Sequence, residues 1–161
     1  THQGQTIEPK KKDSRHTPKY VFLHTFSHAI IRSLGKESGY SVASFSERIY
    51  CSDDMAGIFI FTSSPSSDGA LGGLTEMGRK NENGTSNIWP LLRAAVEESK
   101  ACSCDPLCSL QEPEKIQQEK GSACHACVLL PETCCERMNI LLDRAMIRTT
   151  LATDYGFLRD I

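Results

Sequence analysis

The sequence predicts an α+β fold, in which a small β-sheet packs with helices and a cysteine-rich lobe lies toward the C-terminus. Two observations predict the helices and the sheet. Apolar residues recur at helical spacing in residues 20–38 and 88–100, whereas residues 57–62 form a continuous apolar run of β-favouring side chains. A third observation predicts the lobe, because all of the eight cysteines except Cys51 lie within residues 102–135.

The composition is that of one ordinary globular domain. Of the 161 residues, 39% are hydrophobic and 24% are charged, and the length suffices to bury a core. The chain contains no apolar run of the roughly 18 residues that a membrane-spanning helix needs. The net charge of -2 gives no overall electrostatic case for binding nucleic acid. The polar start contains no apolar signal segment, which predicts a reducing, cytoplasmic location.

Residues 1–19 are predicted to be a flexible lead-in or linker, and residues 20–161 to form the domain. The lead-in is polar, contains three consecutive lysines at positions 10–12, and has no periodic apolar residues. The lysine run is either a solvated tail or an arm that contacts phosphates, and the tail is the favoured interpretation. The polar start without an initiating methionine predicts a piece of a longer protein.

The first half of the domain is predicted to contain one helix and two strands. The helix covers residues 20–38 and ends at Gly35 or Gly39. Residues 40–50 predict a short helix or turn that leads into a strand. Residues 57–62 predict a second strand, which we expect to be central in its sheet.

Two histidines of the first helix, His24 and His28, are candidate site residues. They lie one turn apart on one face, the spacing of metal-binding helices such as H-E-x-x-H, although the general-base Glu of that motif is absent. Glu47 is a candidate third ligand or base. The favoured alternative is that both histidines are core residues with hydrogen-bonded neighbours. Burying them without a partner is costly, so a carboxylate, a backbone group or an ion must accompany them.

The middle of the chain predicts a loop and two helices. Residues 63–73 are rich in Ser and Gly and precede a short predicted helix at residues 74–80. This loop is either a plain connection, which is favoured, or a place where backbone N–H groups at a helix N-terminus bind a DNA phosphate. Its spacing matches neither a P-loop nor a dinucleotide-binding motif. The helix at residues 88–100 then leads to Cys102.

The cysteine pattern favours a metal site. Cys124 and Cys127 form a C-x-x-C pair, and Cys102, Cys104 and Cys108 can supply a second pair at the separation typical of closed tetrahedral zinc sites. A disulfide framework is the main alternative, but a reducing compartment disfavours it. A redox pair is a further alternative, although the βαβ context of thioredoxin-like proteins is missing. The lobe is predicted to cover residues 101–136, approximately.

A last helix is predicted over residues 132–148. In this helix Met138 faces inward, whereas Asp143 and Arg144 face mostly outward. Cys135 lies in its first turn, where the helix N-terminus favours a thiolate. Cys135 is therefore a further candidate ligand.

Several motifs together resemble one known family. The segments are YVFLHTFSHAIIR, SERIY, MAGIFIFT, GALGGL, CSCDPLC, ACHACVLLPETCCE and LDRAM. In this order they resemble the MrfA-type zinc-binding (MZB) domain, in the form found at the C-terminus of the DrmB-like proteins of DISARM anti-phage defence systems. The resemblance covers residues 19–147.

The resemblance implies a structural Zn²⁺ ion held by cysteine. The ligands that it implies are Cys102, Cys108, Cys124 and Cys127. Cys135 also matches a family cysteine and could replace one of them, whereas Cys104 and Cys134 stand where serine is expected. The resemblance gives His24 and His28 no role.

Three functions are compatible with these features. The first, implied by the resemblance, is a non-catalytic accessory domain that works beside a DrmA-like helicase acting on DNA. The second is a metal-dependent phosphodiester hydrolase that uses His24, His28 and Glu47, with Asp53 or Asp54 as further candidate ligands. The third is a scaffold lobe that completes a larger fold. We expect the first, and predict no catalytic residues.

Overall fold

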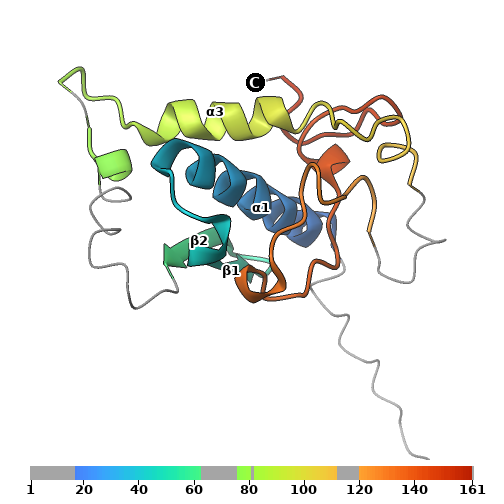
Figure 1. Ribbon diagram of the computed structural model, residues 1–161, viewed down its shortest axis with the longest axis horizontal. Coiled ribbons are helices and arrows are strands. Elements are labelled where there is room, and N and C mark those ends of the chain that lie inside the picture. The colour runs from blue at the N-terminus through green and yellow to red at the C-terminus, as the bar shows by residue number, and fades with distance from the viewer. Residues whose placement is uncertain (1–16, 63–75, 81, 112–119, 161) are drawn as a thin grey trace, which may run out of the picture.

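The computed structural model describes residues 17–62, 76–80, 82–111 and 120–160. Its elements follow in the order α1 (Pro18–Ser38), the 3-10 turn η2 (Val42–Ser44), β1 (Phe45–Cys51), β2 (Ala56–Thr62), α3 (Ile88–Glu98), and the 3-10 turns η4 (Glu132–Cys134) and η5 (Arg144–Met146). Figure 1 shows α1 at the centre, between α3 on one side and the two strands on the other. The predicted α+β class is confirmed.

Helix α1 begins and ends at identifiable capping residues. The Thr17 hydroxyl accepts a hydrogen bond from the Tyr20 backbone N–H at 3.2 Å, and Pro18 occupies the first turn. Gly39 ends the helix in the left-handed conformation at φ 71°. Of the two predicted end points, Gly39 is therefore the correct one, and the helix starts two residues earlier than predicted.

Strands β1 and β2 form an antiparallel hairpin with the register Phe45↔Thr62 to Cys51↔Ala56. Both strands and the turn before β1 were predicted. The expectation that the second strand is central is wrong for the described residues, where the sheet has two strands and β2 therefore has one neighbour. Phe59 and Phe61 stack on the exposed face of the sheet, while Ile58 packs toward the core.

The main core lies where α1 meets α3, the sheet and the C-terminal segment. Its buried members come from all of these parts and are Ala29, Ile30, Ile31, Leu34, Phe45, Leu91, Ala95, Val96, Leu130, Cys134 and Ile147. Helix α3 confirms the prediction for residues 88–100, two residues shorter at its end. Because α1 has neighbours on several sides, its buried residues surround most of its circumference.

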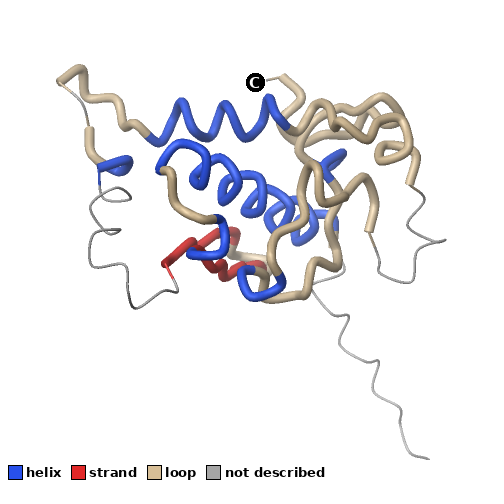
Figure 2. Tube along the Cα trace, viewed as in Figure 1, coloured by secondary structure: helices blue, strands red, loops and turns tan. Residues whose placement is uncertain are grey.

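The helix predicted over residues 132–148 is wrong. This region is an irregular chain in which the turns η4 and η5 are the only helical pieces among the described residues, as Figure 2 shows. The cause is local, because Met138, Asn139 and Leu141 adopt left-handed backbone conformations at φ 51°, 60° and 58°. Such residues interrupt a right-handed helix.

The altered backbone also changes which side chains are buried. Met138 is 69% exposed, contrary to the prediction that it faces inward. Asp143 and Arg144 are buried, at 9% and 0% exposure, although both were expected to face outward. A helical projection cannot apply where the chain follows no regular period.

Some predictions fall on other parts of the chain. The lysine run at positions 10–12 and the Ser/Gly loop at residues 63–73 lie outside the described residues. Of the short helix expected at residues 74–80, residues 76–78 are helical. Among the described helices, none has the length and apolar character needed to span a bilayer.

Candidate metal centre

The first half of the centre is the loop that follows α3. The Asp105 carboxylate accepts hydrogen bonds from the backbone N–H groups of Cys102, at 2.8 Å, and Ser109, at 3.1 Å. The Cys108 N–H donates to the carbonyl of Cys104 at 3.1 Å. Asp105 therefore closes the loop on itself and fixes the spacing between its first and last cysteines.

The second half is the C-x-x-C turn of residues 124–127. The Cys124 carbonyl accepts from the N–H groups of Cys127, at 3.1 Å, and Val128, at 3.0 Å. Arg32 of α1 holds this turn by donating to three carbonyls, those of His125 at 3.4 Å, Ala126 at 2.9 Å and Leu129 at 3.3 Å. The turn is thus fastened to the central helix.

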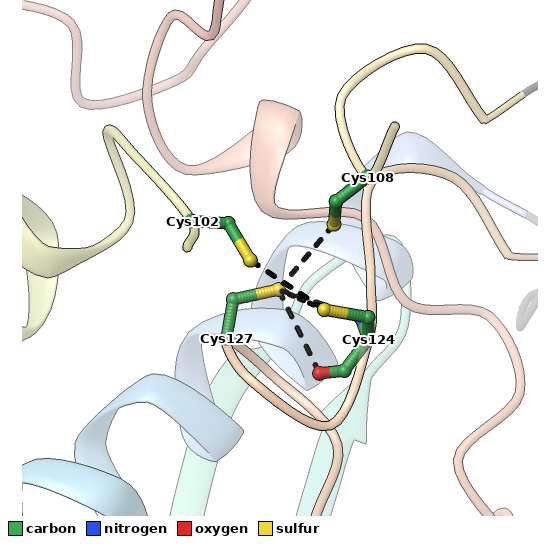
Figure 3. A group of neighbouring side chains, drawn as sticks. All are labelled: Cys102, Cys108, Cys124 and Cys127. Carbon is green, nitrogen blue, oxygen red and sulfur yellow. Dashed lines mark hydrogen bonds between the residues drawn. The ribbon is translucent and has the colours of Figure 1, made fainter. Parts of the chain in front are cut away.

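The two halves bring four thiols to one point. As Figure 3 shows, the sulfurs of Cys102, Cys108, Cys124 and Cys127 face one another. The Sγ–Sγ distances are 3.5 Å for Cys102–Cys124, 3.6 Å for Cys108–Cys127 and 3.7 Å for Cys124–Cys127. A tetrahedral ion with Zn–S bonds of about 2.3 Å places sulfurs roughly 3.8 Å apart. The same distances are far longer than the S–S bond of about 2.05 Å in a disulfide.

Backbone N–H groups point at two of these sulfurs. Cys104 N–H donates to Cys102 Sγ at 3.4 Å, and Cys124 N–H donates to Cys127 Sγ at 3.3 Å. Such bonds stabilise a thiolate relative to a thiol. The donor set, its spacing and these N–H groups all fit zinc.

Hydrogen bonds to the sulfur also favour a thiolate at one position, Cys124. Burial alone raises the pKa of Cys124, but hydrogen bonds from the Cys102 thiol and the Ala126 N–H outweigh it and lower the pKa to about 7. Burial raises the pKa of Cys108 to about 12, and the adjacent guanidinium of Arg144 opposes that rise.

Arg144 supports the centre from the C-terminal segment. Its buried guanidinium forms an ion pair with Asp105 and donates to the carbonyls of Ser99, at 3.2 Å, and Lys100, at 3.1 Å. It therefore joins the end of α3, the first cysteine loop and η5. Periodicity and cysteine spacing did not predict the supporting roles of Arg32, Asp105 and Arg144. The contacts of Arg32 and Arg144 join segments distant in sequence, and those of Asp105 close an irregular loop.

A second group of side chains gathers beside α1. His24, His28 and Glu47 come together as the sequence predicted, and Cys135 joins them. The four residues have exposed fractions of 0%, 0%, 4% and 7%.

The other candidates stay outside both groups. The thiol that was considered for the cysteine set, Cys135, belongs to the histidine group instead. Cys104 is exposed at the edge of the loop. Asp53 and Asp54 are exposed in the turn of the hairpin and are not members of either group.

Two comparisons with known proteins agree with this geometry. The family model described as the MrfA Zn-binding domain matches residues 26–128, more than half of the chain. The chain is also 44% identical over 137 residues to the DISARM protein DrmB of Bacillus paralicheniformis (strain ATCC 9945a / NCIMB 11709 / CD-2). The alignment covers 85% of this chain and 24% of that protein, so the chain spans about a quarter of the length of the curated relative. The chain therefore belongs to the MrfA Zn-binding domain family, its four-cysteine cluster fits that family's metal, and its cofactor is zinc.

Proposed function

We propose that this chain is a zinc-held accessory domain of a DrmB-like DISARM protein, which supports DNA engagement by a partner helicase of the DrmA type. The observation that carries the proposal is the convergence of four thiols in a domain 44% identical to a DISARM protein. The proposed zinc ligands are Cys102, Cys108, Cys124 and Cys127. We place the domain in the cytoplasm, where thiols stay reduced.

The proposed zinc has a structural role. Four cysteine ligands complete a tetrahedral site and leave no position for a substrate or a reactive water. The two loops that carry them are separated in sequence and contain no regular helix or strand. Binding to such loops contributes free energy to folding directly. Here it would fasten the loop after α3 to the turn that Arg32 holds on α1.

The proposed role in DNA engagement is indirect. The net charge of -2 offers no excess of positive charge to neutralise phosphates. We therefore assign DNA engagement to the assembled complex, in which this domain maintains the shape that the helicase recognises.

The hydrolase alternative finds little support in the geometry. A catalytic metal needs an open coordination position that substrate and water can reach. His24 and His28 are fully buried, Glu47 is 4% exposed, and Cys135 stands where an open position would be needed.

The test is co-purification of the protein that carries this domain, expressed in its natural gene context with the other DISARM proteins. Wild type is compared with Cys124→Ser, which removes one proposed ligand, and with Cys104→Ser, a matched control at an exposed cysteine. Helicase association, DNA binding over a salt titration and protection against phage are measured for each.

Wild type and Cys104→Ser are expected to retain all three properties, with DNA binding that weakens steeply as salt rises. Cys124→Ser is expected to lose helicase association and DNA binding together. Full helicase and DNA binding by Cys124→Ser would contradict the proposal. A wild-type domain that folds and binds zinc but pulls down neither helicase nor DNA would favour the plain scaffold function.

A further inference from the structure

The group of His24, His28, Glu47 and Cys135 has the geometry of a coordination site. Glu47 Oε1 lies 3.0 Å from His24 Nε2 and 3.2 Å from His28 Nε2, and Cys135 Sγ lies 3.2 Å from His24 Nε2. All four ligand atoms are within 4.8 Å of one another. The group joins α1, β1 and the irregular C-terminal segment.

The outer hydrogen bonds of the two rings fix where their protons lie. His24 Nδ1 is 3.3 Å from the Leu141 carbonyl, and His28 Nδ1 is 3.1 Å from the Val128 carbonyl. A carbonyl oxygen only accepts, so each Nδ1 carries a proton and donates it. In a neutral ring the Nε2 atom is then a bare lone pair, which is the usual arrangement of a metal-binding histidine.

The Nε2 lone pairs of the two rings face Glu47 Oε1, and that of His24 also faces Cys135 Sγ. Glu47 Oε1 points at both Nε2 atoms, and a carboxylate oxygen accepts hydrogen bonds but donates none. The Ser27 hydroxyl donates a hydrogen bond to Glu47 Oε2, which leaves Oε1 directed at the two rings. Two neutral rings and a carboxylate would therefore meet through acceptors alone.

Cys135 shows the same backbone pattern as the cysteines of the first centre. Its Sγ accepts the N–H groups of Arg137, at 3.3 Å, and Asn139, at 3.2 Å. The left-handed residues Met138 and Asn139 make this turn possible, and non-glycine residues adopt that conformation only where surrounding contacts enforce it. The backbone is thus arranged around a sulfur atom with thiolate character.

Two arrangements would satisfy these acceptors. In the first, both rings carry an extra proton, which places two positive charges in rings whose centroids are 4.7 Å apart and fully buried. Two such charges at that separation repel one another. In the second, a single divalent cation is coordinated by lone pairs of all four side chains. One carboxylate and one thiolate then balance its charge, which suits a site without solvent.

We propose that His24, His28, Glu47 and Cys135 form a second metal site, selective for a divalent cation of the zinc class. Imidazole, thiolate and carboxylate are all zinc ligands, and tetrahedral bonds of about 2.0 Å place nitrogen and oxygen roughly 3.3 Å apart, close to the distances of 3.0 and 3.2 Å here. With four protein ligands the site is closed and structural. It lies beyond the accessory function proposed above and does not depend on it.

The first experiment counts and identifies the ligands of zinc in the 161-residue chain. The protein is purified under reducing conditions and dialysed against a weak chelator to remove surface-bound ions. Native mass spectrometry then counts the zinc ions, and X-ray absorption at the zinc edge reports their ligands. Two ions per chain are expected, with an average shell of about 2.5 sulfur and about 1.5 nitrogen or oxygen atoms. One ion with four sulfur ligands, or two ions with sulfur ligands alone, would overturn the proposal.

The second experiment uses Glu47→Gln, which preserves the shape of the side chain. This variant is expected to lose one zinc ion, and the remaining ion should show sulfur ligands alone. Glu136→Gln is the matched control at another carboxylate that contacts α1, through Tyr20, and should keep both ions. Retention of two ions with unchanged ligands in Glu47→Gln would count against the site.

A third measurement needs no variant. Nitrogen NMR of the histidine rings in the wild type distinguishes a metal-bound Nε2 from a protonated one. The expected result is that His24 and His28 carry a proton at Nδ1 and a metal at Nε2. Protonation of both nitrogens in both rings would establish the two-proton arrangement and overturn the proposal.

Discussion

Tyr20 illustrates how strongly single residues are held at the start of α1. Its side chain is 2% exposed and its hydroxyl donates to Glu136 Oε1 at 3.1 Å. Burial and then the Glu136 carboxylate raise the pKa of Tyr20 well above its usual value near about 10. The neutral form is therefore favoured in the folded state.

Because the pKa of Tyr20 is raised in the folded state, the stability of the protein depends on pH in the alkaline range. The stabilisation linked to Tyr20 is fully present below pH about 10 and is lost as the pH rises through the raised folded value. Absorbance of tyrosinate between pH 9 and 12 should show a late-titrating fraction in the folded wild type and a smaller one in Tyr20→Phe. Denatured protein, in which tyrosines titrate normally, is the control. Equal late fractions in both folded proteins would contradict this assignment.

Gly121 occupies a position where a side chain cannot fit. A Cβ atom there would lie 2.4 Å from the Asp143 carboxyl, which is itself held by the N–H groups of Ser122, at 3.1 Å, and Ala145, at 2.9 Å. Gly121→Ala is expected to lower the free energy of unfolding by about 1–3 kcal/mol, as overpacking usually does. In the control Gly78→Ala, the new Cβ atom has no neighbour within 4 Å, and the free energy of unfolding should change by less than about 0.5 kcal/mol. Urea denaturation measures the stability of both variants. Equal losses of stability would contradict the close approach of the Asp143 carboxyl to Gly121.

At the scale of elements, regular periods were predictable and the irregular C-terminal segment was not. Apolar residues at helical spacing identified α1 and α3, and a continuous apolar run of β-favouring side chains identified β2. The same reasoning failed over residues 132–148, where apolar residues at apparent helical spacing belong to a chain wrapped around Cys135. Of the three left-handed residues, Asn139 is of a type that often adopts this conformation, whereas Met138 and Leu141 give no such signal in the sequence.

The two candidate metal sites likewise contain some residues that the sequence predicted and others that it did not. Spacing identified the C-x-x-C pair of Cys124 and Cys127, because such pairs follow local geometry, but it left Cys102, Cys104 and Cys108 open for the second pair. The family resemblance favoured Cys102 and Cys108, which are the two that lie beside the C-x-x-C pair in the structure. The i, i+4 histidines also pointed to a partner, and Glu47 was named. Cys135 could not be placed with them, because it lies 111 positions from His24 and meets it through tertiary folding.

Helix α1 is the element that holds the C-x-x-C turn, through Arg32. Arg32→Ala removes three hydrogen bonds to the carbonyls around Cys127. We expect it to weaken zinc binding roughly 10-fold, the usual effect of losing an outer partner of a metal site.

Competition with a chromogenic chelator measures the zinc affinity. Lys36→Ala, one turn along α1, is the matched control, since Lys36 forms an exposed ion pair with Glu98 and does not contact the turn. If Arg32→Ala bound zinc as tightly as Lys36→Ala, the hydrogen bonds from Arg32 to the turn would not be needed for zinc binding.

At the scale of the whole molecule, the C-terminal segment is held by side-chain contacts rather than by regular backbone pairing, and it carries two of the four proposed zinc ligands. It nevertheless contributes Leu130, Cys134 and Ile147 to the main core beside α1 and α3. Removing zinc with a strong chelator is therefore expected to lower the melting temperature in one cooperative step, because the segment and the helices share that core. Calorimetry with and without chelator tests this, and an unchanged melting temperature after complete zinc removal would be the contrary result.

The central claim is that Cys102, Cys108, Cys124 and Cys127 hold a structural zinc. The most direct measurement is zinc retained per chain after dialysis, for wild type, Cys124→Ser and Cys104→Ser purified side by side. The account predicts that Cys124→Ser loses at least one equivalent of zinc and that Cys104→Ser, at an exposed position in the same loop region, keeps the wild-type amount. Wild-type zinc content in Cys124→Ser, or loss of zinc in Cys104→Ser alone, would contradict it.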